Sequence, residues 1–272
     1  MRILLLARIL SSAAAAQILT DPPPIVQLVR KPGTGGASLK AYANARAEIN
    51  VIGMASVTGL PETWLVEAHY SFASVEDLDQ RIGALAPVRS FSDASDPLQD
   101  DVLAPSRTML AQYRTDWSYR ADQAIRMFPK ARYFQISLFR IRPGTEANFG
   151  QLIRLRRATA DAVNLDRPEL AYQVFSGAPA GTWVFLAPIA SLRSFDDGKN
   201  SMPVYAEGLA NARAKDGSQI ALDTEISREH LLFRVEPRIS SPNSASVPGL
   251  MRNREIWKYR ARGNMRIAWS GR

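Results

Sequence analysis

The chain has 272 residues, 46% of them apolar, which is enough for a substantial buried core in one or two domains. It has no cysteine and only two histidines, His69 and His230, which excludes disulfides, thiolate chemistry and a zinc site with three histidine ligands. The net charge is +8, but eight basic residues and one acidic residue follow Pro237. The preceding part is therefore nearly neutral, and we expect no nucleic-acid partner.

Residues 1–16 have the pattern of a signal peptide. Arg2 gives a basic start, residues 3–10 form a short apolar stretch that Arg8 interrupts, and residues 14–16 are alanines typical of a cleavage site. We therefore expect a periplasmic or secreted protein that begins near Gln17 after cleavage. The alternative is a cytoplasmic protein with an apolar N-terminus. No stretch reaches the roughly 20 apolar residues of a membrane-spanning helix.

Residues 17–128 predict the order strand, helix, strand, strand, helix, strand. An apolar run at 25–30 ends at Lys31-Pro32-Gly33-Thr34, and Ser38 can begin a helix. Residues 51–72 then predict two strands joined by a hairpin that contains Gly and Pro, and Ser74 stands where a second helix would be capped. Residues 108–114 predict the last strand.

Residues 129–240 predict the same order again. A strand at 133–142 ends at Arg142-Pro143-Gly144-Thr145, and Thr145 can cap a helix whose apolar residues recur at helical spacing from Phe149. A hairpin at 170–188, a helix capped by Ser191 and a strand at 229–235 complete the set.

Four phrases recur in the same order in both parts. Pro-Gly-Thr recurs after 111 residues and Thr-Trp after 119, while "SVEDLD" matches "SLRSFD" and "YRTD" matches "FRVE". This repetition indicates an internal duplication, with each copy in the βαββαβ order of a ferredoxin-like unit. We expect repeat 1 at 17–128, repeat 2 at 129–240, and a basic, flexible tail at 241–272. Each unit would leave one sheet face bare, so we expect the two units to pack sheet to sheet with their helices outside.

The element order and the duplicated phrases resemble the dimeric α+β barrel superfamily over about residues 25–240. This group includes NIPSNAP-like and antibiotic-monooxygenase-like domains and the tandem chlorite-dismutase and dye-decolourising-peroxidase folds. The chain is also similar to uncharacterised secreted bacterial proteins of this build. The resemblance implies an α+β fold of two tandem ferredoxin-like repeats in a pseudo-dimeric barrel. The superfamily contains oxygenases, haem enzymes, isomerases and ligand-binding proteins, so the resemblance selects no activity.

Glu67 and His69 are the candidate catalytic residues. Alternation along residues 64–72 places Trp64 and Val66 on one face, which we expect to pack against the helices. Glu67 and His69 would then face the space between the sheets, where a carboxylate and an imidazole could move a proton. The alternative is a solvated pair near a sheet edge. The repeat matches these positions to Leu186 and Pro188, so such a site would belong to one copy only.

Gln135, Ser137 and Gln173 are the candidate ligand-binding residues. They are polar residues in apolar strands, and they face either a cavity between the sheets or the outward side of the strands. His230 could be an axial haem ligand, but no ligand motif surrounds it, and a half-exposed strand histidine is the alternative.

We expect a non-catalytic protein that binds an apolar or mixed small molecule, or that serves as an interaction module. The alternative is a cofactor-independent oxygenase or related small-molecule enzyme that uses Glu67 and His69, and a haem enzyme is the third hypothesis. We expect no cofactor and no metal ion. The duplication allows a monomer, and a homo-oligomer is the alternative.

Overall fold

The structure, a computed structural model, describes residues 21–33, 50–77, 107–197, 201–215 and 224–240. Eight antiparallel strands close into a barrel in the order β1-β3-β2-β8-β5-β7-β6-β4. Their bounds are β1 (Ile25–Pro32), β2 (Val51–Ser56), β3 (Glu62–His69), β4 (Arg107–Tyr113), β5 (Tyr133–Ile141), β6 (Leu170–Ser176), β7 (Thr182–Ile189) and β8 (Glu225–Val235). The predicted α+β class is confirmed.

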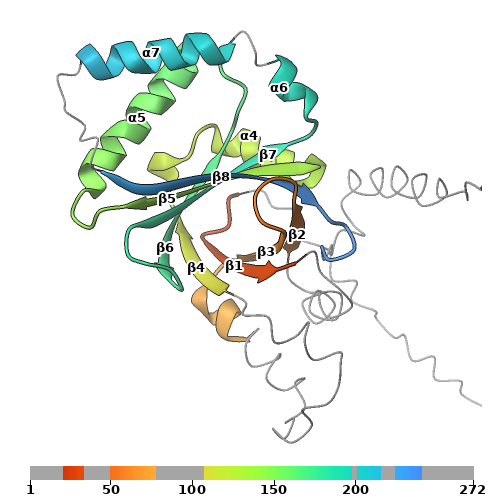
Figure 1. The fold of residues 1–272 in the computed structure, drawn as a ribbon. Coiled ribbons are helices and arrows are strands. Elements are labelled where there is room, and N and C mark those ends of the chain that lie inside the picture. The colour runs from red at the N-terminus through yellow and green to blue at the C-terminus, as the bar shows by residue number, and fades with distance from the viewer. Residues whose placement is uncertain (1–20, 34–49, 78–106, 198–200, 216–223, 241–272) are drawn as a thin grey trace, which may run out of the picture.

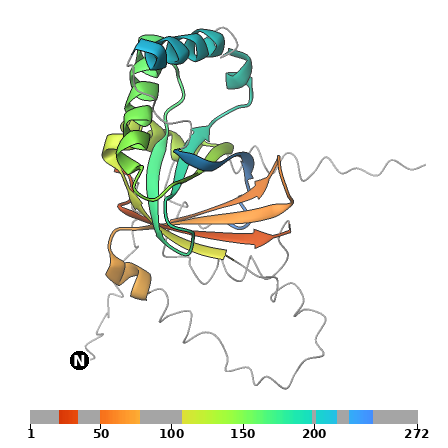
Figure 2. The same ribbon diagram turned by 60° about the vertical axis from the view of Figure 1, so that its left-hand side comes forward.

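The described helices lie outside the strands or at the ends of the barrel (Figure 1). They are residues 72–77, η1 (Thr115–Trp117), α4 (Ala121–Met127), η2 (Phe128–Lys130), α5 (Glu146–Ala162), α6 (Arg193–Asp197) and α7 (Ser201–Lys215). Helices α5 and α7 lie together on one side of the barrel, and Figure 2 shows α7 meeting α5 near one end. None of the helices in the described ranges is long and apolar enough to cross a membrane.

The first four and the last four strands follow the same spatial order. Their sequences across the sheet are β4-β1-β3-β2 and β8-β5-β7-β6. The two sets meet at two seams: β2 pairs with β8 over three residue pairs, and β4 pairs with β6 over four. Within the second set, β5 pairs with β8 over nine residue pairs. The β2–β8 seam is therefore the shortest ladder of the barrel, and the β4–β6 seam is as short as the β6–β7 ladder, which also has four pairs.

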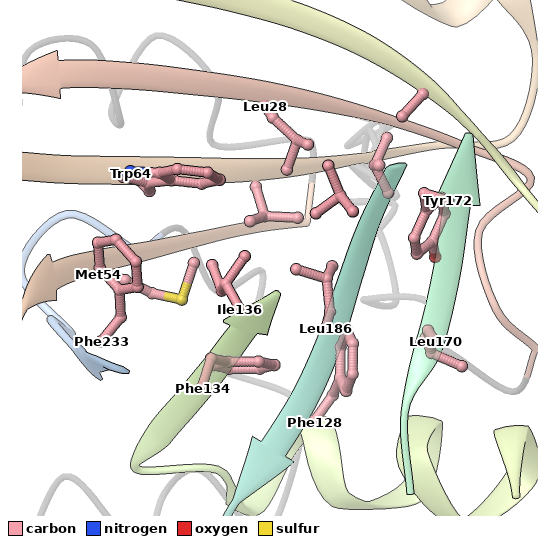
Figure 3. Close-up of a cluster of buried hydrophobic side chains, with 14 of the residues drawn as sticks. Leu28, Met54, Trp64, Phe128, Phe134, Ile136, Leu170, Tyr172, Leu186 and Phe233 are labelled. Carbon is pink, nitrogen blue, oxygen red and sulfur yellow. The ribbon is translucent and has the colours of Figure 1, made fainter. Parts of the chain in front are cut away.

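Apolar side chains fill the interior of the barrel (Figure 3). Every strand contributes, and Ala124 and Ile125 of α4 with Phe128 add to the same cluster at one end. Trp64 and Phe233, from β3 and β8, lie with their ring centroids 5.3 Å apart. The residues from the strands are Val26, Leu28, Met54, Trp64, Val66, Met109, Ala111, Phe134, Ile136, Leu138, Leu170, Tyr172, Val174, Val184, Leu186 and Phe233.

The predicted alternation along β3 is correct, but its two faces were assigned the wrong way round. Trp64 and Val66 point into the barrel, whereas Leu65 packs on the outer face against Val29. Glu67 and His69 share the outer face with Leu65 because side chains alternate along a strand. Nearly all of β3 is buried, so the sequence pattern could not distinguish inside from outside.

The Thr-Trp match aligns residues of opposite faces. Trp64 lies in the barrel interior, whereas Trp183 lies outside it and stacks on Trp117 with ring centroids 3.8 Å apart. A one-residue offset moves every side chain of a strand to the other face. The predicted counterpart of Glu67, Leu186, accordingly points into the barrel and does not occupy the same place.

The helix starts differ in detail from the prediction. Thr145 precedes α5, but its hydroxyl donates to the carbonyl oxygen of Arg142 and makes no capping bond to the helix. Ser74 lies inside the helix 72–77, and Ser71 caps it by accepting a hydrogen bond from the Ser74 amide at 3.2 Å. Ser191 precedes α6 and accepts from the Arg193 amide as expected. The helix predicted from Ser38 lies outside the described residues.

The segment 236–240 covers the outer face of β2 at Gly53. The Gly53 amide donates to the Ser240 hydroxyl at 3.0 Å, and the Glu236 amide donates to the Gly53 carbonyl oxygen at 2.8 Å. Ile239 completes an outer cluster with Val29, Val51 and Leu65. A Cβ atom at position 53 would lie 2.5 Å from the side chain of Ile239, so glycine is required for this close approach.

Candidate functional site

A pocket of about 330 Å³ lies outside the barrel, between the outer face of the sheet and helices α5 and α7. Its floor comes from β5, β7 and β8, one wall from α5 and another from α7. Figure 1 shows how these strands and helices are arranged. The residues that line it are Tyr119, Gln135, Ser137, Leu152, Ile153, Arg156, Arg157, Ala160, Leu165, Arg167, Glu169, Ala187, Met202, Tyr205, Leu209, Arg228 and His230.

The polar floor of the pocket follows from strand alternation and register. Because Phe134 and Ile136 point into the barrel, Gln135 and Ser137 point outward. Ser137 is paired directly with His230 of β8. Cross-strand partners have neighbouring side chains, so two strands distant in the sequence place a hydroxyl and an imidazole together.

The wall from α5 joins an apolar part to a cationic part. Leu152 and Ile153 are buried against the outer face of the sheet. Arg156 and Arg157 follow three to five residues later and return to the same side of the helix. The pocket is thus apolar beside the sheet and cationic further along α5.

Four arginines and one carboxylate line the pocket, namely Arg156, Arg157, Arg167, Arg228 and Glu169. Burial raises the pKa of Glu169, and the neighbouring arginines Arg156, Arg157 and Arg167 oppose this shift without cancelling it. Burial lowers the pKa of Arg156, but the charge of Glu169, with further help from Tyr205 and Glu225, makes the net shift upward. Arg156 therefore stays charged, and the lining carries a clear excess of positive charge.

Each of the other arginines is held in place by a specific contact. Arg228 forms an ion pair with Glu225 on its own strand. Arg157 donates to the backbone carbonyl oxygen of Asp116, and the guanidinium of Arg167 lies 4.8 Å from the ring centroid of Phe195. The partners of Arg157 and Arg167 in these contacts are uncharged, so the contacts position the guanidinium groups without neutralising them.

His230 and Ser137 form a hydrogen-bonded pair on the pocket floor. The Ser137 hydroxyl oxygen lies 2.8 Å from Nδ1 of His230. Burial lowers the pKa of His230, and Arg228 and Arg156 lower it further, while Glu225 opposes them. The imidazole is therefore neutral at pH 7, and Nε2 is the ring nitrogen left for a ligand.

Two of the three predicted ligand-binding residues line this pocket. Gln135 and Ser137 do so, but on the outer face of the strand and not in a cavity between two sheets. Gln173 is not among the lining residues, and its side-chain oxygen accepts a hydrogen bond of 2.7 Å from Arg114. Whether these residues bind a ligand stays a prediction.

The predicted pair Glu67 and His69 lies on the outer face of β3 and is not among the residues of this pocket. Their exposed side-chain fractions are 0% and 1%, so they are not the solvated pair of the alternative interpretation. The Nε2 atom of His69 lies 3.9 Å from a carboxylate oxygen of Glu67. A role of this pair in proton transfer stays a prediction.

Ser74 completes a short polar chain with this pair. Its hydroxyl oxygen lies 3.2 Å from Nδ1 of His69, and the hydroxyl donates its hydrogen to the Ser71 carbonyl oxygen at 2.8 Å. Because that hydrogen is already used, the bond to His69 requires Nδ1–H as the donor. His69 therefore does not act as a base toward Ser74 in this arrangement.

Sequence reasoning missed the arginines that dominate the pocket. The run Arg154, Arg156 and Arg157 in α5, followed by Arg167, was the available signal. The basic charge was instead assigned to the segment after Pro237. Of the described residues, no group of three or more His, Asp or Glu side chains is placed to hold a metal ion.

No protein-family model and no curated protein matches the chain. Among solved structures it is similar to an anthrone oxidase-like protein, with a TM-score of 0.47 and 11% identity over 78% of this chain and 92% of that one. A chlorite dismutase variant from Candidatus Nitrospira defluvii gives a TM-score of 0.46 and 10% identity over 81% and 94% of the two chains. A heme-binding protein from Thermus thermophilus gives 0.42 and 8% over 80% and 93%. These likenesses concern the course of the chain and carry no statement on activity.

Proposed function

We propose that this protein binds a small anionic molecule with an apolar part in the pocket between α5, α7 and the outer face of the sheet. The observation that carries the proposal is the set of four arginines around a partly enclosed, partly apolar cavity with one lining carboxylate. Small-molecule sites combine apolar walls with a few placed polar groups, and arginine favours carboxylate, sulfonate and phosphate oxygens. The lining supports binding, because it offers cationic and apolar contacts to such a molecule.

The test compares an anion with a neutral molecule of the same shape. Benzenesulfonate and benzenesulfonamide share a ring and differ mainly in charge, and both are titrated into the purified protein by NMR. We expect the anion to bind at least about tenfold more tightly, because charge-assisted hydrogen bonds to arginine are lost with the neutral probe. Equal affinities, or no binding of either probe, would refute the proposal.

A pair of variants locates the binding. Arg156→Gln removes a lining guanidinium, whereas Arg154→Gln removes an exposed arginine of the same helix that does not line the pocket. We expect the first variant to weaken the preference for the anion and the second to keep it. Native mass spectrometry of the untreated protein would complement the titration, because a co-purified anion would identify the natural ligand class directly.

We further propose that the chain contains two tandem ferredoxin-like units and that it is exported. The shared order β4-β1-β3-β2 and β8-β5-β7-β6 supports two tandem ferredoxin-like units. The pattern of residues 1–16 supports export and cleavage near Gln17. Intact-mass measurement of the protein from a bacterial periplasmic fraction tests the second point, and a mature chain that still starts at Met1 would contradict it.

A further inference from the structure

The charge balance of the pocket narrows the class of ligand, given that the pocket binds an anion as proposed above. Arg156, Arg157, Arg167 and Arg228 bring four positive charges to the lining. Glu169 is the lining carboxylate, and Glu225 neutralises Arg228 from the edge of the floor. With His230 neutral, about two positive charges are left without a negative counterpart among these groups.

Uncompensated charge is costly in a partly buried site. Burial disfavours every charged group unless an opposite charge or hydrogen bonds replace the lost water. Arg157 and Arg167 meet a carbonyl oxygen and an aromatic ring in the contacts described above, and neither partner cancels a charge. A ligand with one negative charge would neutralise half of the excess, and a ligand with two would neutralise all of it.

We propose that the pocket selects a doubly charged anionic group, a phosphate monoester of an apolar or aromatic alcohol, over singly charged acids. A phosphate monoester carries nearly two negative charges at neutral pH and three acceptor oxygens. Arginine side chains match such oxygens with paired N–H donors. The apolar part of the molecule would then contact Leu152, Ile153, Met202 and Leu209, which provide the apolar lining from α5 and α7.

The hydrogen-bonded pair on the floor agrees with this assignment. In the Nε2–H tautomer of His230, Nδ1 accepts the hydrogen of the Ser137 hydroxyl, and Nε2–H is left as a donor that adds no charge. A phosphate group has enough oxygens to accept from Nε2–H of His230 and from two guanidinium groups at once. A carboxylate has fewer acceptor oxygens and would leave some of these donors without an acceptor. In a half-buried site, each such donor makes the free energy of binding less favourable.

The experiment compares phenyl phosphate with benzenesulfonate, two probes with the same ring and different charge. At pH 7.5 we expect the phosphate to bind at least about tenfold more tightly than the sulfonate. Equal affinity would overturn the selection for a doubly charged group and leave anion binding intact. Binding of neither probe would overturn both proposals.

Lowering the pH gives a second readout on the unaltered protein. The second pKa of a phosphate monoester is about 6, so at pH 5 phenyl phosphate is a singly charged anion like the sulfonate. Protonation of His230 or Glu169 affects both probes alike, so the ratio of their affinities isolates the charge of the ligand. We expect this ratio to fall to within about threefold of unity. A ratio that stays the same at pH 5 would contradict the proposal.

The variant Arg156→Gln should reduce the ratio at pH 7.5, while Arg154→Gln should leave it unchanged. Circular dichroism confirms that each variant is folded before titration. If Arg156→Gln does not fold, the pH series on the unaltered protein still decides the question. A full preference for phosphate in folded Arg156→Gln would show that the selection does not come from this cluster of arginines.

Discussion

The contact between Gly53 and the segment 236–240 gives the sharpest prediction on stability. Gly53→Ala would place a Cβ atom 2.5 Å from the Ile239 side chain and 2.7 Å from the Ile239 backbone oxygen. A side-chain rotation cannot relieve a clash with a backbone atom, so the segment 236–240 has to move away from β2. Ile239, which is 8% exposed, would then lose its contacts with Val29, Val51 and Leu65.

The loss of stability comes from the contacts and hydrogen bonds that the displaced segment no longer makes. Exposing a buried isoleucine costs about 1.5–3 kcal/mol. The two hydrogen bonds that join Gly53 to Glu236 and Ser240 are worth about 1 kcal/mol each if they are not replaced by water. We expect Gly53→Ala to lower the free energy of unfolding by about 2–5 kcal/mol, with the lower end if water replaces the two hydrogen bonds, or Tm by roughly 5–20 °C.

Urea denaturation followed by circular dichroism measures this loss, and a double-mutant cycle tests its cause. Ile239→Ala removes the side chain that the new methyl group would meet. If Gly53→Ala already detaches the segment, the second substitution adds little, and the two costs are far from additive. A cost below about 0.5 kcal/mol for Gly53→Ala, or strict additivity in the double variant, would refute the reasoning.

Three further predictions concern the core and two titrating groups. Ile136→Ala should lower the free energy of unfolding by about 2–5 kcal/mol in urea denaturation, because it opens a cavity in the barrel interior. The control Val204→Ala changes a side chain that is 53% exposed, so its free energy of unfolding should stay within about 0.5 kcal/mol of the parent. His230→Gln should lose less stability than the parent between pH 7 and pH 5, because the lowered pKa of His230 makes the parent less stable as pH falls below the unfolded value of 6.5. Burial and then Asp161 raise the pKa of Tyr119 to about 12, so the parent should lose stability as pH rises above 10. Tyr119→Phe should not show this loss when urea midpoints are compared at pH 9 and pH 11.5. Parallel pH profiles for parent and variant would contradict either titration argument.

Much of the fold was predictable because the strands are bounded by clear turn residues. The apolar runs that end at Pro32 and Pro143 are strands β1 and β5, and the hairpins that contain Gly59 and Gly177 join β2 to β3 and β6 to β7. The orientation of the strands was not predictable. In β3 and β7 both faces are buried, so alternation shows two faces but not which one points into the barrel.

The candidate site was predictable only in part, for a different reason. Gln135 and Ser137 were visible as polar residues in an apolar strand. Arg156, Arg167 and Arg228 come from a helix, a connecting segment and a strand, and their meeting depends on the register of β5 with β8 and on the placement of α5. Such a meeting is a property of tertiary structure, which no local pattern encodes.

The short seam between β2 and β8 has a consequence for synthesis of the chain. Gly53 on β2 and Ser240 after β8 are 187 residues apart, so β2 acquires its outer neighbour only when almost all of the described fold has left the ribosome. Until then β2 presents an unpaired edge, and β5 presents a longer one that β8 will later fill. Open edges favour pairing between chains. A nascent or truncated chain that ends before residue 224 should therefore be prone to self-association and to recognition by chaperones, while the finished barrel offers neither edge.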